Sequence, residues 1–390
     1  MAAVVSRSIS RSGGRSSAPA RVRVGVIVNK VGGYSRGVLR GVASFAFARH
    51  WTCHMQGVNA TSIFRNRQRF DGLIVQTATA KQAAALRATA VPVVNVSSAV
   101  ELSELPSIVS DDRAVGRMGA DYFLRRGYRK YAFFAPDTRH FAKLRHEGFA
   151  QRLAESDMKA RLIESESALS VSILAGDAPL AVMGCNDRAA LTVLDRCRAT
   201  GVRVPEEVAV LGVDNDDLMQ SLAYPPLSSI NTARERIGFE AAALLERLIG
   251  GARVDPTPRL IPPVGVIPRG STDALALADP EVAGAIRFID ANVGRRIGVI
   301  DVAENVAMSR RQLERRFRAA TGVSILDEIT RRRVDRARQL LADTELTLDQ
   351  VATATGFNNS SYLSVIFKTK TGLTPGGFRE RFRVEGRSQA

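Results

Sequence analysis

The chain has 390 residues, and its 55 Lys and Arg against 39 Asp and Glu give a formal net charge of +16. A hydrophobic content of 45% with 24% charged residues is typical of a folded protein and excludes disorder throughout. Three cysteines without a C-x-x-C pair and four scattered histidines exclude a disulfide-built scaffold and the common zinc sites, so we expect no metal and no cofactor. Because no apolar run approaches the ~18–20 residues of a membrane span, we expect no membrane segment.

The first twenty residues are rich in Arg, Ser, Gly and Ala and contain no acidic residue. They lack the apolar stretch of about 7–15 residues that a signal peptide carries. An organellar transit peptide has a similar composition. We predict instead that residues 1–20 form a disordered basic tail on a cytoplasmic protein.

Apolar strands and amphipathic helices alternate over residues 21–272. Continuous apolar strands that alternate with helices are typical of parallel sheets covered on both faces. Because about 250 residues exceed one comfortable core, we expect two lobes with a cleft between them. Strands are predicted at 22–28, 71–76, 91–96, 106–112, 128–135, 180–187 and 208–215, and helices at 80–90, 113–126, 143–155 and 188–200.

Polar side chains follow four of these predicted strands. In open α/β sheets, ligands bind outside the carboxyl ends of the strands. Each polar residue alone can be a turn former or a helix cap, but the set favours a binding site in the cleft. The residues are Asn29, Ser110-Asp111-Asp112, Asn186-Asp187 and Asp214-Asn215.

The segment 256–273 carries five of the fifteen prolines, and everything beyond it has a helical pattern. We therefore predict a linker at 273–282 and an all-α domain at 283–385. Residues 281–390 hold 19 basic and 13 acidic residues, a net +6 from about a quarter of the chain. Such a local excess favours contact with nucleic acid.

The C-terminal region contains an internal repeat with a spacing of about 50 residues. Each copy predicts a short helix, a tight turn and a longer helix, which is the helix-turn-helix pattern. Ser309 and Asn359 are the expected N-caps of the two longer helices, and an amphipathic helix at 331–344 lies between the copies. The pair Val302-Ala303 recurs as Val351-Ala352, and Leu313, Phe317 and Gly322 recur as Leu363, Phe367 and Gly372, so the second copy has one extra residue near Gly356-Phe357.

The longer helix of the first copy places Arg310, Arg311, Glu314 and Arg315 on its outward side near the N-terminal end. A recognition helix presents its N-terminal residues to base edges in the major groove, and Arg can donate two hydrogen bonds to guanine. Some of these arginines hold phosphates instead. A basic helix that only faces solvent is the alternative interpretation.

The C-terminal ~100 residues resemble the AraC family of transcription regulators. The match rests on Leu313, Arg315 and Phe317, on the Gly356-Phe357 turn and on the closing GLTPGGFR at 372–379. The resemblance implies that Arg311 and Arg315 face bases in the first unit. In the second unit it implies the same for Ser360, Ser361 and Ser364.

The second unit departs from the AraC pattern at Val365, where many members carry a base-reading Arg. We therefore expect weaker direct readout by this unit, with Lys368 and Lys370 on phosphates. Two such units joined by one rigid helix should read major-groove segments about one DNA turn, ~34 Å, apart.

The segments 33–46, 70–75, 109–134 and 204–217 resemble the sugar-sensing domain of LacI-type repressors and periplasmic binding proteins. In that family, residues such as Arg145 and Asp214 contact the sugar; a structural ion pair between the two is the alternative interpretation. The segment 155–178 is shorter than in the family and lacks the long helix expected there, which affects the pocket. The resemblance implies a ligand site at Tyr34, Ser35, Arg36, Asp111, Arg145, Asn186, Asp187, Asp214 and Asn215.

The two resemblances together imply a sequence-specific DNA-binding transcription regulator, an activator, and not an enzyme. A small sugar in the N-terminal cleft, a pentose such as xylose, would control its binding to double-stranded operator DNA. A homodimer and a contact with RNA polymerase are also expected. The alternatives are a sugar-modifying enzyme, which no Ser-His-Asp order or P-loop supports, and a solute-binding protein, which the basic C-terminus opposes.

Overall fold

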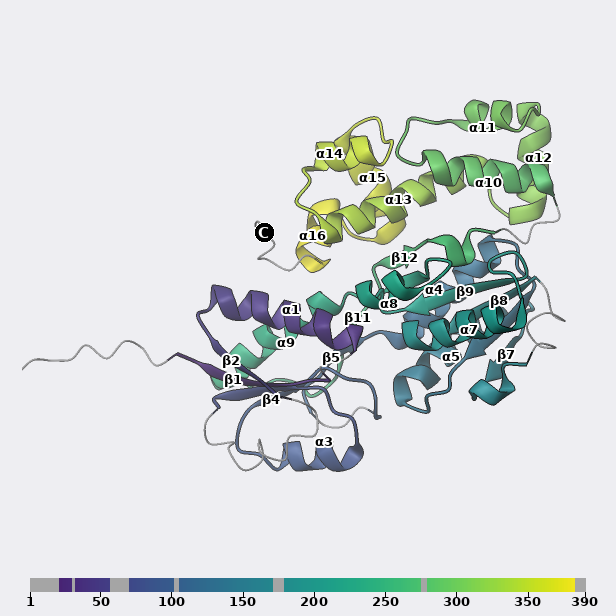
Figure 1. Ribbon diagram of the computed structural model, residues 1–390. Helices are drawn as coiled ribbons and strands as arrows, with labels where there is room; N and C mark the ends of the chain where they lie inside the picture. The colour runs from purple at the N-terminus through teal and green to yellow at the C-terminus, as the bar shows by residue number, and fades with distance from the viewer. Residues whose placement is uncertain are drawn as a thin grey trace, which may run out of the picture.

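The computed structural model describes residues 21–29, 32–56, 70–101, 105–170, 179–274 and 279–382. The predicted tail at 1–20 lies outside these residues, as do 171–178 of the segment predicted to be short and 275–278 of the predicted linker. Within the described residues, a two-lobed α/β part is followed by an all-helical part that lies against it (Figure 1). The predicted fold class is confirmed.

The first lobe is built on a four-stranded parallel sheet in the order β2-β1-β3-β4. The buried residues of β3 and β4 are continuous, as expected for a sheet covered on both faces. A parallel pair, β5 with β11, continues beside β4 through a bridge between Asn95 and Ser107. The strands are β1 (Arg23–Ile27), β2 (Thr52–Gln56), β3 (Gly72–Val75), β4 (Val93–Asn95), β5 (Ile108–Ser110) and β11 (Arg259–Ile261), and the helices are α1 (Gly33–Ala48), α3 (Ala80–Arg87) and α9 (Arg234–Ile249).

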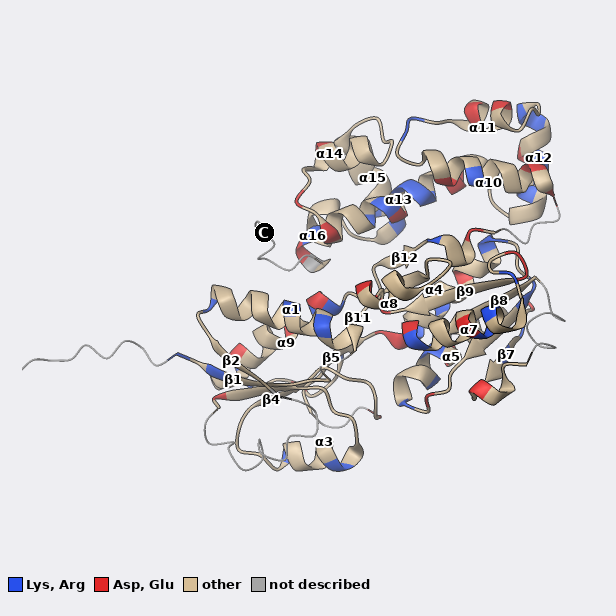
Figure 2. Ribbon diagram, viewed as in Figure 1, with Lys and Arg blue, Asp and Glu red and all other residues tan. Residues whose placement is uncertain are grey.

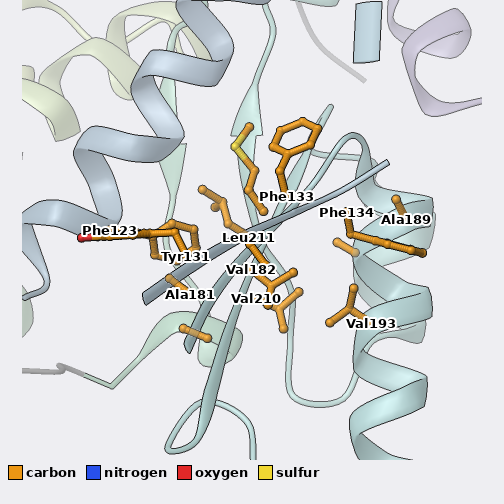
Figure 3. Packing of buried hydrophobic residues seen from close by; sticks show 14 of the residues in the cluster. Phe123, Tyr131, Phe133, Phe134, Ala181, Val182, Ala189, Val193, Val210 and Leu211 are labelled. Atoms are coloured by element: carbon orange, nitrogen blue, oxygen red, sulfur yellow. The ribbon is translucent and has the colours of Figure 1, made fainter. Parts of the chain in front are cut away.

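The second lobe holds a six-stranded sheet in the order β12-β10-β9-β8-β6-β7, in which only the edge strand β12 runs antiparallel. Phe134 reaches from β6 toward Ala189 of α7 in the core of this lobe (Figure 3). The strands are β6 (Lys130–Phe134), β7 (Ala160–Ile163), β8 (Leu180–Gly184), β9 (Val208–Val213), β10 (Ser228–Asn231) and β12 (Gly265–Ile267), and the helices are α4 (Asp112–Arg125), α5 (His140–Ala154), α7 (Asp187–Thr200) and α8 (Asp217–Leu222).

The segment predicted to be short contains β7 and a single 3₁₀ turn, η2 (Glu166–Ala168), within its described residues. The chain passes between the two lobes three times: after β5, after β10, and between β11 and β12. These three crossings set the cleft at the carboxyl ends of the strands, where the sequence predicts it.

The helical part contains two helix-turn-helix units, α11–α12 and α14–α15, as predicted from the repeat. The long helix α13 joins them, and the repeated Leu and Phe of each recognition helix are fully buried. No helix among the described residues is long and apolar enough to cross a membrane. The helices are α10 (Pro280–Asn292), α11 (Val299–Asn305), α12 (Arg310–Thr321), α13 (Ile325–Asp343), α14 (Leu348–Ala354), α15 (Ser360–Thr371) and α16 (Pro375–Phe382).

The two units share one turn geometry. Ala307 with a φ of 52° and Gly356 with a φ of 72° occupy equivalent left-handed positions, and the residue after each returns a backbone hydrogen bond to Ala303 or Ala352. The extra residue of the second unit therefore follows this turn, at Asn358. Asn359 caps α15 by accepting a hydrogen bond from the Tyr362 amide at 2.7 Å, whereas Ser309 occupies the N-cap position of α12 without a side-chain bond.

Candidate functional site

A cavity of about 500 Å³ lies between the two lobes, at the carboxyl ends of the strands. It has the size of a small-molecule site. Two of the nine predicted ligand residues come from the start of α1, one from α5 and three from the ends of β8 and β9. Tyr34, Ser35, Arg145, Asn186, Asp187 and Asp214 line the cavity together.

Three predicted ligand residues do not line the cavity, and each has another role in the fold. Arg36 forms an ion pair with Asp216. Asp111 caps α4, because its carboxylate accepts a hydrogen bond from the Ala114 amide at 3.0 Å. The Asn215 side chain accepts a hydrogen bond from Arg269 at 2.9 Å.

Arg145 reaches the cavity because α4 and α5 pack unusually closely. A Cβ added at Gly116 would lie only 1.9 Å from the Arg145 carbonyl oxygen. A residue larger than glycine at this position would therefore prevent the two backbones from approaching so closely. Arg145 Nε donates to Asp112 Oδ1 at 2.8 Å, and Nη1 donates to the Cys185 carbonyl at 2.7 Å. Asp214 Oδ1 lies farther from the guanidinium, 3.7 Å from Nη2.

The Arg145–Asp214 ion pair, which the sequence analysis gave as the alternative to ligand contact, is therefore present. The closer partner of Arg145 is Asp112. Asp112 is 2% exposed, and its second oxygen accepts a hydrogen bond from Ser98 at 2.5 Å. The negative charge of Asp214 is therefore less well neutralised by Arg145 than the charge of Asp112. Burial raises the pKa of the Asp214 carboxyl.

Asp187 sits at the first turn of α7 with both carboxylate oxygens occupied. It accepts hydrogen bonds from the Asp216 amide at 2.7 Å and from Ser229 Oγ at 2.5 Å. Burial, together with the nearby Asp214 carboxylate, raises the pKa of Asp187 to about 7. The cavity therefore holds a carboxyl that titrates near neutrality.

Tyr34 and Ser35 close the cavity from the first lobe. The Tyr34 hydroxyl donates to the Val96 carbonyl at 2.9 Å, and burial raises the pKa of this phenol. Ser35 Oγ donates to Gln76 Oε1 at 2.8 Å. These bonds fix two side chains at the wall of the cavity before any ligand enters.

Several cavity residues are missing from the ligand site that the family resemblance implies. Ser110 Oγ is buried at the wall and has no hydrogen-bond partner among the described residues. Further wall residues include Asp137 and Arg139, which pair with each other in the loop before α5, and Phe141, whose ring centroid lies 4.9 Å from the Arg145 guanidinium carbon. The polar residues after the predicted strand included Ser110 and Asp112, but the family resemblance selected only Asp111 of this run as a ligand residue.

The cavity is therefore rich in carboxylates, hydroxyls and guanidinium groups. Such groups pair with the vicinal hydroxyls of a polar ligand, and Phe141 offers an apolar ring face beside them. Within the described part of the chain, no group of three His, Cys, Asp or Glu side chains could hold a metal ion.

The first recognition helix, α12, is rich in arginine, coloured blue in Figure 2, and its exposed arginines form a cationic surface. Ser309, Arg311 and Arg315 are exposed, and the two arginines have no hydrogen-bond or ion-pair partner among the described residues. Arg310 is also exposed but pairs with Glu314, at 3.0 Å between Nε and Oε1. The two unpaired arginines are available to a nucleic acid.

Arg316 belongs to the same helix but faces inward. Its guanidinium contacts Asp279 at 2.6 Å and Glu281 at 2.8 Å, which fastens α12 to the start of α10. This arginine therefore supports the fold of the first unit and does not extend the cationic surface.

The second recognition helix, α15, is less charged. Ser361 and Lys368 are exposed, whereas Ser360 and Ser364 are half-buried, and Ser364 Oγ donates to the Ser360 carbonyl at 2.8 Å. Lys370 lies 3.9 Å from Asp327 of α13, so this predicted phosphate contact already faces a carboxylate.

The helix α13 connects both units to the α/β part. Arg338 and Gln339 donate to the Pro263 and Val266 carbonyls, at 3.2 and 2.8 Å, around the third crossing between the lobes. Near the middle of α13, Arg332 pairs with Asp290 of α10 at 2.6 Å, and Asp290 lies 3.9 Å from Arg126. Arg126 directly follows α4, whose first residue, Asp112, binds Arg145.

Both the α/β part and the helical part of the chain are similar to known proteins. Residues 120–272 match a periplasmic binding protein-like domain, and residues 302–381 match a helix-turn-helix domain. The chain is 28% identical over 379 residues to the xylose operon regulatory protein of Haemophilus influenzae, across 90% of this chain and 96% of that protein.

Solved structures give the same result. A structure described as a xylose-binding transcription activator matches with a TM-score of 0.60 and 26% identity, across 93% of this chain and 98% of the other. A dimeric lac repressor matches with a TM-score of 0.56 and 22% identity, across 65% of this chain and 100% of the other, and shows the fold of the α/β part.

The enzyme and transport alternatives are not favoured, because the relatives that match over nearly the whole chain are transcription regulators. In this chain the match to the periplasmic binding protein-like domain precedes the match to the helix-turn-helix domain. The chain therefore resembles, over nearly its whole length, AraC-type DNA-binding transcription regulators that carry a periplasmic-binding-protein-like domain.

Proposed function

We propose that a small sugar binds in the cavity between the lobes and controls the binding of the helical domain to operator DNA. In this proposal residues 21–272 form the sensor and residues 283–385 form the DNA-binding domain. The proposal rests on the cavity, whose size and polar wall suit a monosaccharide. A pentose such as xylose is the first candidate, because xylose appears in the names of the two relatives that match along nearly the whole chain.

The unpaired Ser110 Oγ is the observation that supports a polar ligand most directly. A buried hydroxyl without a partner is unfavourable, and a ligand hydroxyl in the cavity would satisfy it. Arg145 and Asp214 face the same space, and their long separation of 3.7 Å leaves both able to bond a ligand. Sugar binding would then add bonds that the empty cavity lacks.

Control of DNA binding requires that the sugar distinguishes two states of the protein. Closure of the lobes around a ligand bends the three crossings between them. The third crossing is held by Arg338 and Gln339 of α13, and α13 carries both helix-turn-helix units. A change in lobe angle is therefore passed directly to the spacing or orientation of the recognition helices.

The remaining parts of the proposal follow from the DNA. A homodimer would place two copies of the tandem units on repeated half-sites, the arrangement that many helix-turn-helix regulators use. An activator would in addition contact RNA polymerase, and the protein would act in the cytoplasm.

The experiment is thermal unfolding of the full-length protein with a panel of pentoses and hexoses. A sugar at 100-fold above its Kd should stabilise the native state by about 2.7 kcal/mol. Ser110→Ala should weaken this stabilisation while leaving the stability of the ligand-free protein unchanged or higher, since it removes an unpaired polar atom. Ser221→Ala, which changes an exposed serine of α8, is the matched control.

Two outcomes would contradict the proposal. One is a panel in which no sugar stabilises the protein at millimolar concentration. The other is conversion of a pentose to a product by the purified protein, which would favour the enzyme alternative.

A further inference from the structure

The two recognition helices differ at the positions that face outward near their N-terminal ends. An offset of 50 residues places Ser361 where the first unit has Arg311, and Val365 where it has Arg315. Val365 is 63% exposed, and Leu363 and Phe367 on the opposite side of α15 are fully buried. The two helices therefore present the same face with different chemistry.

Val365 contributes little to the fold of its own unit. Its side chain is exposed, and a β-branched residue is a weaker helix former than alanine or arginine. A single exposed apolar side chain is ordinary on a protein surface, so exposure alone carries no function. The position matters because the equivalent Arg315 is exposed and has no partner among the described residues.

Val365 has one apolar neighbour on the exposed side of α15, between the exposed polar residues Ser361 and Lys368. Tyr362, three residues before it and thus on the same side, is 50% exposed, and its ring packs against Phe357 at 6.0 Å between centroids. The hydroxyls of Ser364 and Thr369 donate to carbonyl groups of their own helix, at 2.8 and 2.9 Å. Their donor hydrogens are thus already used within α15.

We propose that Val365 contacts the 5-methyl group of a thymine in the major groove, and that Tyr362 covers the adjoining apolar surface. Thymine carries the one methyl group among the standard bases in this groove, and apolar side chains recognise it. The second unit is then a reader of T·A pairs, whereas Arg311 and Arg315 make the first unit a reader of G·C pairs. The inference rests on DNA binding by the helical domain and extends it to base preference.

The test uses the full-length protein and duplexes that it enriches from a random library. Each thymine of the enriched sequence is replaced in turn by deoxyuridine, which removes one methyl group and leaves every hydrogen-bonding group in place. Loss of one buried methyl contact should weaken binding about fourfold. The sensitive thymine should lie about one DNA turn, ~34 Å, from the guanines that the first unit contacts.

Variants assign the effect to the side chain. Val365→Ala should bind the thymine and the deoxyuridine duplexes equally. It should not change the base preference in the DNA segment that the first unit reads. Val365→Arg should change the enriched base pair from T·A to G·C. Leu222→Ala, which shortens a side chain 76% exposed on α8 of the sensor, should keep the full fourfold difference.

The proposal is overturned if no thymine in the second segment depends on its methyl group, or if Val365→Ala retains the fourfold difference. An enriched sequence with neither effect leaves DNA binding intact and removes only the thymine contact. Failure to enrich any sequence would overturn the DNA-binding assignment and the thymine contact together.

Discussion

The two helix-turn-helix units share a scaffold and differ in their outer surfaces. In both, a Leu and a Phe four residues later are fully buried, and a left-handed residue forms the turn. On the outside, the first unit presents Arg311 and Arg315 and the second presents Ser361 and Val365. The core of such a unit is therefore set by packing, while its exposed face is left to vary with the DNA that it reads.

The units also differ in how they meet the sensor. The first packs on α10, and Asp290 of α10 lies 3.9 Å from Arg126 at the end of α4. The second shares a hydrophobic cluster with the first lobe, and Arg236 of α9 donates to the Glu380 carbonyl at 2.5 Å. A signal from the cavity can thus reach the two units by different contacts.

The largest expected effect tests the shared scaffold. Phe317→Ala and Phe367→Ala each remove a fully buried ring from equivalent positions and should destabilise the protein by about 3–5 kcal/mol. Thermal and urea unfolding of the full chain would measure both losses. A loss in one variant and none in the other would show that the two cores are not equivalent.

The next effect tests the difference between the faces. Arg315→Ala should weaken binding to enriched DNA by about 1–3 kcal/mol and relax the preference for guanine in the first segment. Fluorescence anisotropy with guanine and adenine variants of the duplex would measure it. Arg318→Ala, at an exposed residue one turn further from the N-terminus of α12, should lower affinity without changing base preference.

A smaller effect tests the turns. Gly356→Ala should destabilise the protein by more than about 1–2 kcal/mol, because φ is 72° and an added Cβ would lie 2.3 Å from the Arg295 carbonyl oxygen. Ala307→Gly should have the opposite sign, a gain of about 0.5–1 kcal/mol, since it relieves a non-glycine residue at a φ of 52°. Thermal unfolding of both variants checks the signs, and equal signs would contradict the shared geometry.

The smallest effect tests the connection to the sensor. Gln339→Ala removes the hydrogen bond from α13 to the Val266 carbonyl, about 0.5–1.5 kcal/mol of interaction. The change in DNA affinity that a bound sugar causes should shrink by a corresponding twofold to tenfold, with sugar affinity nearly unchanged. Gln151→Ala, at an exposed residue of α5, is the control and should leave the response intact.

The sequence predicted the helix-turn-helix units well because their cores repeat with a constant offset. The spacing of Leu313 and Phe317 placed α12 and its outer face correctly. It could not show that Arg316 turns toward Asp279 and Glu281, because these partners lie 37 and 35 residues away along the chain. Periodicity assigns a side chain to a face but does not identify its partner.

The cavity was harder to predict than the recognition helix. The strand ends indicated its position, and six of the nine proposed residues line it. At the first crossing, two adjacent aspartates follow the strand, and only the start of the helix decides their roles. Asp111 became the cap of α4, so Asp112 is the residue that points to Arg145.

In the proposed function, a sugar in the cavity changes the affinity of the protein for DNA. The direct measurement is the Kd of the full-length protein for its enriched duplex, with and without a saturating pentose that stabilises the protein. We predict a change of about fivefold or more, which corresponds to a coupling free energy of at least about 1 kcal/mol. A pentose that binds and stabilises the protein but leaves the Kd for DNA unchanged would contradict the account.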